Sequence, residues 1–160
     1  MRLFILCIAL LIITSCQSMH SNDPNSLFFS IPAGSTLSLG KELSISSTET
    51  HGTIQAGKQI ADDDRQFYDI SCRLDFEKFG PRTIEPEKFT VTRTEDGQNW
   101  ISQPSILRFY TEVYLKSNKD TDIIKMVCQF YGDTIDRNFT VAEMQEALGD
   151  FVTIEYATTK

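Results

Sequence analysis

Histidine is scarce in this chain of 160 residues, which contains only His20 and His51. The chain also has no G-x-S-x-G, no H-E-x-x-H and no Walker-type glycine-rich loop. These motifs supply a serine nucleophile, a zinc-binding catalytic pair and a phosphate cradle, respectively. Their absence removes the usual signatures of those enzyme classes. His20 lies in a polar segment and His51, between Thr50 and Gly52, is expected in a surface turn, so no catalytic residue, metal site or cofactor is predicted.

Long apolar runs are also missing. The run Leu3 to Ile13 has eleven residues, whereas a bilayer-spanning helix needs about twenty. Positive charge is in deficit, because 15 basic residues face 22 acidic ones, a formal net charge of −7. Without the segment that carries Arg2, 14 basic and 22 acidic residues remain, or −8. Phosphate backbones repel such a domain, so nucleic acid is not an expected partner.

The N-terminus has the pattern of a secretory signal. Arg2 supplies positive charge, the eleven-residue run is an h-region, and Thr14 and Ser15 are small. The order Ile13-Thr14-Ser15-Cys16 resembles a bacterial lipobox; an ordinary cleaved signal followed by an incidental Cys is the alternative. The resemblance implies cleavage before Cys16 and acylation of Cys16, and several acyl chains make a firm membrane anchor. The expected division is a lipoprotein signal peptide at 1–15, the lipidated Cys and a flexible tether at 16–26, and one β-rich domain at 27–160. Gln17 rather than Asp after the Cys favours the outer membrane.

The body is rich enough in apolar residues for a core, with 41% hydrophobic residues and 11 Phe. Alternating or short apolar segments separated by turn residues predict strands. We expect them at 27–31, 36–39, 43–46, 67–77, 89–93, 108–117, 122–131 and 151–156. Hairpins are expected around Ala56-Gly57, at Asn118-Lys119-Asp120 and at Glu95-Asp96-Gly97, the last placing Val91 opposite Ile101. The acidic run 62–64 predicts a turn.

One short helix is specified near the C-terminus. Thr140 and Glu143 form a T-x-x-E capping box, and Phe139 and Met144 occupy the positions of a hydrophobic staple. Val141, Met144 and Leu148 make one apolar stripe, and Gly149 ends the helix. The predicted fold is therefore mainly β, an antiparallel β-sandwich or small barrel with one short C-terminal helix; the alternating strands favour the sandwich.

Cys72 and Cys128 each lie on the apolar face of a predicted strand. In an oxidising compartment such an even pair predicts a disulfide. Two buried free thiols are the alternative. Neither Cys has a further Cys or His at metal-ligand spacing, so a metal site is not expected there.

Two groups of side chains are candidates for function. Tyr110, Tyr114 and Tyr131 fall on the faces opposite the core-facing residues of their hairpin, and exposed tyrosines on a sheet form a rigid, amphipathic binding surface. Cover by the helix or a second sheet is the alternative. Glycan hydrolysis would need a pair of carboxylates, and nothing in the sequence selects two from the available set of Glu49, Asp75, Glu77, Asp133 and Asp136.

Several strings are similar to a group of small proteobacterial envelope proteins. They are T-L-S-L-x-x-x-L-S-I, T-I-Q-A-G-K, F-Y-D-I-S-C-R-L-D-F and R-T-I-E-P-E-K-F-T-V-T-R, followed by F-Y-T-E-V-Y-L-K-S, M-V-C-Q-F-Y-G and T-V-A-E-M-Q-E-A-L-G. The resemblance covers most of residues 35–150 and departs at Ile45-Ser46-Ser47, where Pro is expected after the aliphatic residue. It implies an envelope location, fits a structural Cys72–Cys128 disulfide and brings no catalytic residues.

Three functions remain open at this point. The first is a lipid-anchored, periplasm-facing, non-enzymatic binding or structural module, attached to the membrane through Cys16 and able to contact an envelope protein. The second is an inhibitor or capture protein for a basic envelope-acting enzyme such as a lysozyme, toward which an acidic domain would be steered. The third is a carboxylate-based glycan hydrolase. Oligomeric state is not predicted.

Overall fold

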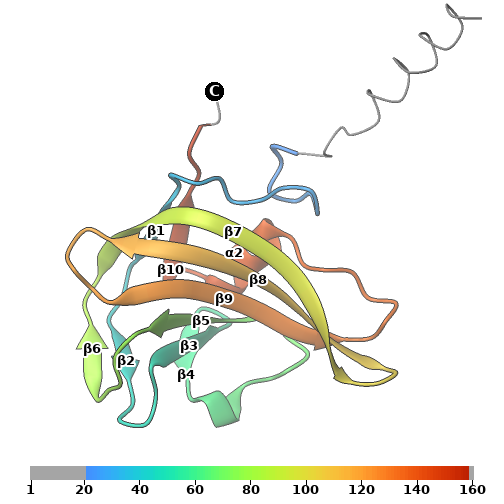
Figure 1. Cartoon of the computed structure of the whole chain (residues 1–160), viewed down its shortest axis with the longest axis horizontal. Helices are drawn as coiled ribbons and strands as arrows, with labels where there is room; N and C mark the ends of the chain where they lie inside the picture. The colour runs from blue at the N-terminus through green and yellow to red at the C-terminus, as the bar shows by residue number, and fades with distance from the viewer. Residues whose placement is uncertain (1–20, 159–160) are drawn as a thin grey trace, which may run out of the picture.

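The computed structural model describes residues 21–158, which fold mainly as β-strands with one short C-terminal helix (Figure 1). The expected signal peptide at 1–15, Cys16 and residues 17–20 of the expected tether lie outside the described residues. Within residues 21–158, no helix has the length and apolar character needed to cross a membrane. The elements in chain order are β1 (Thr36–Leu39), β2 (Leu43–Ile45), β3 (His51–Gln55), β4 (Lys58–Ile60), the 3-10 turn η1 (Asp62–Asp64), β5 (Ser71–Phe76), β6 (Arg82–Ile84), β7 (Glu87–Ser102), β8 (Ile106–Ser117), β9 (Ile123–Gly132), α2 (Val141–Leu148) and β10 (Val152–Glu155).

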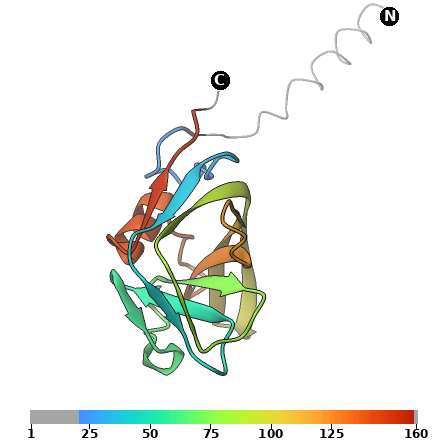
Figure 2. The ribbon, with the colours of Figure 1, turned by 90° about the vertical axis from the view of Figure 1, so that its left-hand side faces the viewer.

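Eight strands form one antiparallel sheet in the order β10-β1-β7-β8-β9-β5-β3-β4, and β2 pairs with β6 in a small second sheet. The large sheet curls into a half-barrel (Figures 1 and 2). Helix α2 contacts β3, β5 and β10, so it bridges the two ends of the sheet. Figure 2 shows α2 beside β10 and next to the β3–β4 hairpin. The predicted mainly-β class with a C-terminal helix is confirmed, and the curled sheet corresponds to the barrel-like arrangement rather than to two stacked sheets.

The core fills the concave side of the half-barrel. The predicted alternation on β8 is confirmed, since Phe109, Thr111, Val113 and Leu115 are all buried. Their neighbours on β7, β9 and β5 face the same way, and Met144 and Leu148 of α2 are fully buried against them. Burial of this kind stabilises the fold by roughly 25 cal/mol for each Å² of apolar surface removed from water.

The helix has the ends that its sequence predicts. Thr140 Oγ1 accepts from the Glu143 N–H, and the Glu143 carboxylate accepts from the Thr140 N–H at 2.7 Å. Phe139 and Met144 are buried as a staple requires. A second N–H group of the first turn has a partner distant in the sequence, since the Ala142 N–H donates to the Pro24 carbonyl at 3.1 Å. The last part of the segment expected to be a tether therefore contacts the helix start.

The predicted disulfide is present. Cys72 of β5 and Cys128 of β9 lie directly opposite one another in the ladder, with Cα atoms 4.0 Å apart, and both side chains are fully buried. The bond joins residues 56 positions apart in the sequence.

The hairpin predicted at Glu95-Asp96-Gly97 is wrong. Strand β7 runs through these residues to Ser102, and Val91 pairs with Leu115 instead of Ile101. Gly97 is opposite Tyr110, whose ring occupies the space above it, so that a Cβ on Gly97 would lie 2.5 Å from the ring. Asp96 accepts a hydrogen bond from the Thr111 hydroxyl across the strands. Asp96 and Gly97 therefore pair with β8 as part of strand β7, and the turn between β7 and β8 lies at residues 103–105.

Three further strand predictions need correction. Residues 27–31 form no strand, although Phe29 and Ile31 are buried. The strand expected at 67–77 covers only Ser71–Phe76. Alternation with Ile70 and Cys72 predicts Tyr68 on the core face, but Tyr68 is 69% exposed. Alternation along the predicted strand 122–131 places Ile124 on the core face with Met126 and Cys128, but the ladder between β9 and β5 skips Ile124, because Asp75 pairs with Lys125 and Phe76 with Ile123. This bulge turns Ile123 into the core and leaves Ile124 exposed.

Candidate functional site

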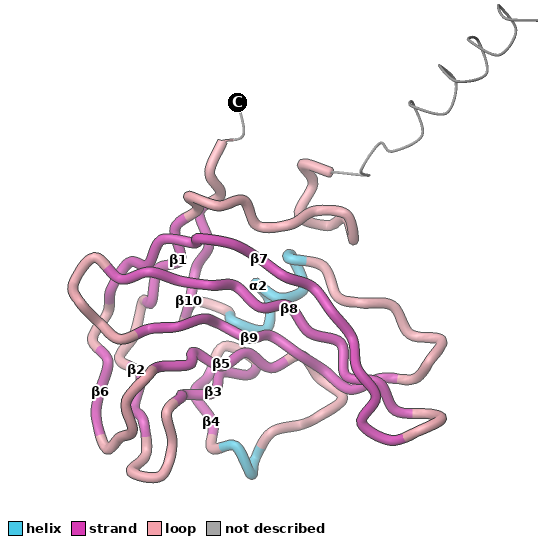
Figure 3. Tube along the Cα trace, viewed as in Figure 1, coloured by secondary structure: helices cyan, strands magenta, loops and turns pink. Residues whose placement is uncertain are grey.

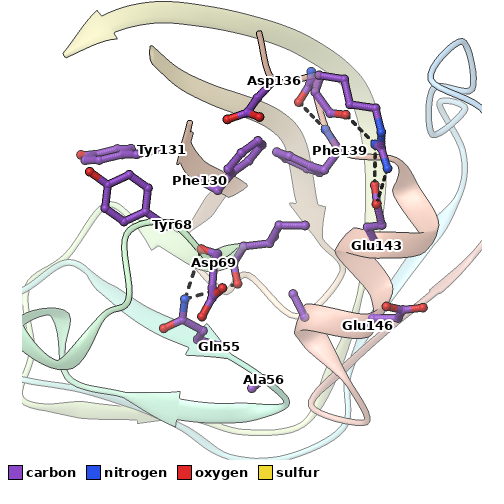
Figure 4. A pocket seen from close by; sticks show the side chains of 14 residues that line it. Gln55, Ala56, Tyr68, Asp69, Phe130, Tyr131, Asp136, Phe139, Glu143 and Glu146 are labelled. Atoms are coloured by element: carbon purple, nitrogen blue, oxygen red, sulfur yellow. Dashed lines mark hydrogen bonds and ion pairs between the residues drawn. The ribbon is translucent and has the colours of Figure 1, made fainter. Parts of the chain in front are cut away.

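A cleft of about 720 Å³ opens where the end of β9, the loops 66–70 and 133–139, and α2 meet (Figure 4). Figure 3 shows both loops on the side of the sheet where β9 ends. The lining residues are Gln55, Ala56, Tyr68, Asp69, Ile70, Phe130, Tyr131, Asp136, Arg137, Asn138, Phe139, Glu143, Glu146 and Ala147. The end of β3 with the turn after it, the two loops, β9 and α2 therefore build one concave surface.

The 66–70 wall of the cleft is held by the side chain of Gln55. Its amide nitrogen donates to the carbonyls of Gln66 at 2.9 Å and Asp69 at 3.2 Å, and its oxygen accepts from the Gln66 N–H at 3.0 Å. The Tyr131 N–H donates to the Phe67 carbonyl at 2.7 Å, and the Phe67 ring stacks on the Tyr131 ring at 5.2 Å between centroids. These contacts fix a loop that has no secondary structure of its own.

The helix wall begins at the capping box. Arg137 makes a two-point ion pair with Glu143, with N–O distances of 2.9 and 2.6 Å. The hydrogen bonds from Arg137 lower the pKa of Glu143 to about 2, aided by the bonds from Thr140 and opposed by burial. Glu143 is therefore ionised and already paired, which makes it unsuited to act as a general acid.

Aromatic rings form much of the cleft surface. Figure 4 shows Tyr68 and Tyr131 on one side and Phe130 and Phe139 at the centre. The Phe130 ring packs edge-on against Phe139 at 5.9 Å and stacks on Phe109 at 5.1 Å, which ties the cleft to the core. Tyr68 is free to contact a ligand, because it is 69% exposed.

The charge of the cleft is negative. Four carboxylates line it, those of Asp69, Asp136, Glu143 and Glu146, against the single guanidinium of Arg137. Glu143 is neutralised by Arg137, and Asp136 accepts from the Asp133 N–H at 2.6 Å. Among residues 21–158, neither the Asp69 nor the Glu146 carboxylate has a hydrogen bond or ion pair. Aromatic faces and unpaired carboxylates together favour a ligand that carries positive charge on an organic group.

The disulfide braces this region. Cys72 is two residues after Ile70, and Cys128 is two residues before Phe130, so the bond joins the strand that follows the 66–70 loop to the strand that carries the aromatic floor. The cleft is thus built on a covalently fixed strand pair.

The three predicted tyrosines are all half-buried, on the convex face of the sheet away from the main core. Only Tyr131 lines the cleft. The Arg93 guanidinium lies 3.7 Å from the centroid of Tyr114, and that of Arg108 lies 4.5 Å from the centroid of Tyr110. These two rings are therefore partly covered by arginines of the same face and do not join Tyr131 in one site.

The predicted carboxylates are also dispersed. Asp136 lines the cleft, whereas Glu77 and Asp133 are exposed elsewhere. Asp75 pairs with Arg73 at 3.0 Å on the convex face, and burial raises its pKa. Glu49 lies in a second cavity with His51, which is not the surface turn residue expected, since it begins β3 and its side chain is 13% exposed.

Tyr68, Asp69 and Glu146 are the cleft residues that the sequence does not identify. Tyr68 continues the alternation of β5, which predicts a core residue, and the sequence does not distinguish Asp69 and Glu146 from ordinary surface charges. Glu146 lies one turn beyond Glu143 on the outer face of α2, and this helical spacing is the sequence feature that comes nearest to indicating that the two residues share a surface.

Comparison of the chain with protein-family models, with curated proteins and with solved structures found no match in any of the three.

Proposed function

We propose that this protein is a non-enzymatic binding module of the bacterial envelope, lipid-anchored through Cys16, facing the periplasm from the outer membrane. The apolar run Leu3–Ile13 and the lipobox-like Ile13–Cys16 support the anchor. The Cys72–Cys128 disulfide supports a compartment that is oxidising.

The anchor has a direct test. Cys16→Ser removes the acylated thiol, so the chain is expected to leave the membrane fraction, while Cys7→Ser in the same apolar segment stays membrane-bound. Metabolic labelling with a palmitate analogue is expected to mark the wild type and the Cys7 variant only. A Cys16→Ser chain that remains in the membrane fraction would contradict the anchor.

The cleft carries the binding proposal, because it pairs aromatic faces with the free carboxylates of Asp69 and Glu146. A primary ammonium or guanidinium group is attracted by the ring faces of Tyr68 and Tyr131, each contact contributing about 0.5–2 kcal/mol. A carboxylate that receives its hydrogen bond contributes about 1.5–3 kcal/mol. The proposed ligand is accordingly an organic cation, such as a lysine or arginine side chain or a free amine.

Calorimetric titration with lysine amide that is acetylated on its α-amine, so that the side-chain ammonium is the only cation, tests this directly. We expect a Kd on the order of 1 mM, or about −4 kcal/mol, and no measurable binding of the norleucine analogue, which has the same stem without the ammonium. Asp69→Asn is expected to weaken binding about tenfold, while Asp63→Asn, an equal charge change outside the cleft, leaves it unchanged. Tyr68→Ala weakens binding, and Phe79→Ala, which removes an exposed ring elsewhere, does not. Equal binding of lysine and norleucine amides would overturn the ligand class.

A second candidate function is favoured by the same acidic cleft. A basic envelope-acting enzyme, such as a lysozyme, would present lysine or arginine side chains to Asp69 and Glu146, and the net charge of −7 would steer the encounter. Inhibition of a lysozyme should then fall steeply as ionic strength rises, since salt screens exposed charges beyond about 10 Å at 0.1 M. Absence of inhibition at low ionic strength would eliminate this candidate and leave the small-ligand proposal standing.

A further inference from the structure

A second cluster of polar side chains lies at the opposite end of β3 from the cleft. Glu49, His51 and Asp62 each offer one ligand atom, and these atoms all lie within 4.8 Å of one another. They line a cavity of about 400 Å³ between β2 and the β3–β4 hairpin. The cleft begins at Gln55 and Ala56, after the far end of the same strand. The two sites therefore share a strand and no lining residue.

The imidazole of His51 stands between two carboxylates. Its Nε2 lies 2.8 Å from Asp62 Oδ2, and its Nδ1 lies 3.5 Å from Glu49 Oε2. A neutral imidazole has one N–H and one lone pair, so it can donate to only one of these carboxylates. The other carboxylate then faces a lone pair, an arrangement that either protonation of the ring or a bound metal cation relieves.

The surrounding contacts hold the donors in place. The Thr53 hydroxyl donates to Asp62 Oδ1 at 2.5 Å, which leaves Oδ2 directed at His51. The Glu49 backbone is fixed on both sides, donating to the Ser46 carbonyl at 3.2 Å and accepting from the Gly80 N–H at 3.0 Å. Hydrogen-bonded ligands of this kind are typical of metal sites.

The cavity wall is equally well defined. The Gln59 side chain accepts from the Ser44 N–H at 3.0 Å and donates to the Ser44 carbonyl at 2.5 Å, which fastens β4 to β2. The cavity of about 400 Å³ beside the three donors has room for a water on the fourth position of an ion.

We infer that Glu49, His51 and Asp62 form a binding site for a divalent transition-metal ion, with Zn²⁺ the best fit. One imidazole nitrogen and two carboxylate oxygens suit zinc, which binds such donors at about 2.0–2.2 Å in a tetrahedron with its donors roughly 3.4 Å apart. His51 Nε2 and Asp62 Oδ2, now 2.8 Å apart, would separate slightly to admit the ion. Glu49, whose side chain is 42% exposed, lies beside Nδ1 and would turn toward the same ion, from a position where one donor atom of each residue is within 4.8 Å of the others. Ca²⁺ is excluded by donor type and number, because it takes six to eight oxygens.

The site is testable on the full chain, purified without an affinity tag, stripped with a chelator and alkylated so that free thiols cannot bind metal. Equilibrium dialysis against Zn²⁺ is expected to give one ion per chain, and Co²⁺ is expected to give the visible absorption of a tetrahedral complex without thiolate bands. His51→Ala should weaken Zn²⁺ binding at least about 100-fold, and Asp62→Asn or Glu49→Gln at least about tenfold. Asp63→Asn and His20→Ala, which alter a neighbouring carboxylate and the other histidine, should leave it unchanged.

The conservative variants Asp62→Asn and Glu49→Gln keep the experiment informative if His51→Ala does not fold. Absence of Zn²⁺ and Co²⁺ binding to the wild type overturns the site, as does Zn²⁺ binding that survives Asp62→Asn and Glu49→Gln undiminished. Loss of stability in these variants without metal binding to the wild type would show that the cluster only clamps η1 to β3. None of these outcomes depends on whether the cleft binds a cation.

Discussion

Gln55 illustrates how much of the cleft depends on single buried polar side chains. It is 9% exposed, and it satisfies two carbonyls and one amide of the 66–70 loop. Without such partners, the buried backbone groups of the loop would destabilise the folded state by their full desolvation penalty. One side chain at the end of β3 thus supplies three of the hydrogen bonds that position Tyr68 and Asp69.

Replacing Gln55 with Ala should lower the free energy of unfolding by about 3 kcal/mol, since three hydrogen bonds are lost and each contributes about 1 kcal/mol. The same variant should lose binding of lysine amide, because the loop that carries Asp69 is released. Urea denaturation and calorimetry measure the two effects. Gln98→Ala, at an exposed position of β7, should change stability by less than about 0.5 kcal/mol. Unchanged stability and binding in the Gln55 variant would show that the loop is held by other contacts.

At the scale of elements, α2 has two roles. Its apolar stripe closes the core between the two ends of the sheet, and its outer face supplies Glu143 and Glu146 to the cleft. The capping box and the Arg137 pair set where the helix begins, so they also set where these carboxylates lie.

The pH dependence of stability should report this helix end. The folded-state pKa of Glu143 is about 2, below its ordinary value of 4.5, so its contribution is complete above about pH 4.5 and is lost as pH falls toward 2. Glu143→Gln should be less stable than the wild type by up to about 1 kcal/mol at pH 7, and the difference should vanish between about pH 4.5 and 2. Thermal melts across this range measure it. Glu146→Gln should show no such trend; a Glu143→Gln difference that persists at pH 2 would be inconsistent with the pairing.

An element could be predicted from the sequence when the residues that determine it are near neighbours in the chain. The capping box of α2, the alternation of β8 and the Ala56-Gly57 hairpin, whose residues have φ of 50° and 71°, are set by near neighbours in the sequence. The Asp96-Gly97 pair misled because a ring from the next strand covers Gly97, an interaction between residues 13 positions apart. The cleft could not be predicted for the same reason, since its walls come from residues 55 to 147 and meet only after folding.

On the scale of the whole molecule, the half-barrel is an open sheet that one helix bridges and one disulfide crosslinks. Helix α2 contacts strands at both ends of the sheet, and the Cys72–Cys128 bond joins the neighbouring strands β5 and β9. The loop from η1 to Ile70 begins at the His51 cluster and ends at the cleft, so both proposed sites lie along one segment of the chain.

Reduction of the disulfide should lower the free energy of unfolding by roughly 4 kcal/mol, the loop-closure value for about 57 residues. Urea denaturation with and without reductant measures this, and the Cys72→Ala, Cys128→Ala double variant serves as the control that should not respond to reductant. A change of less than about 1 kcal/mol would mean that the bond does not constrain the unfolded chain as expected.

The most direct test of the cleft as a cation-binding site is an NMR titration with the lysine amide, observing labelled isoleucine and alanine methyl groups. Ile70 and Ala147 line the cleft, whereas Ile60 and Ala61 line the second cavity and provide internal controls. We expect saturable shifts of the Ile70 and Ala147 methyl signals, absent with the norleucine analogue, and no shift of Ile60 or Ala61. Stationary Ile70 and Ala147 signals at ligand concentrations well above 1 mM would contradict the binding function proposed for this protein.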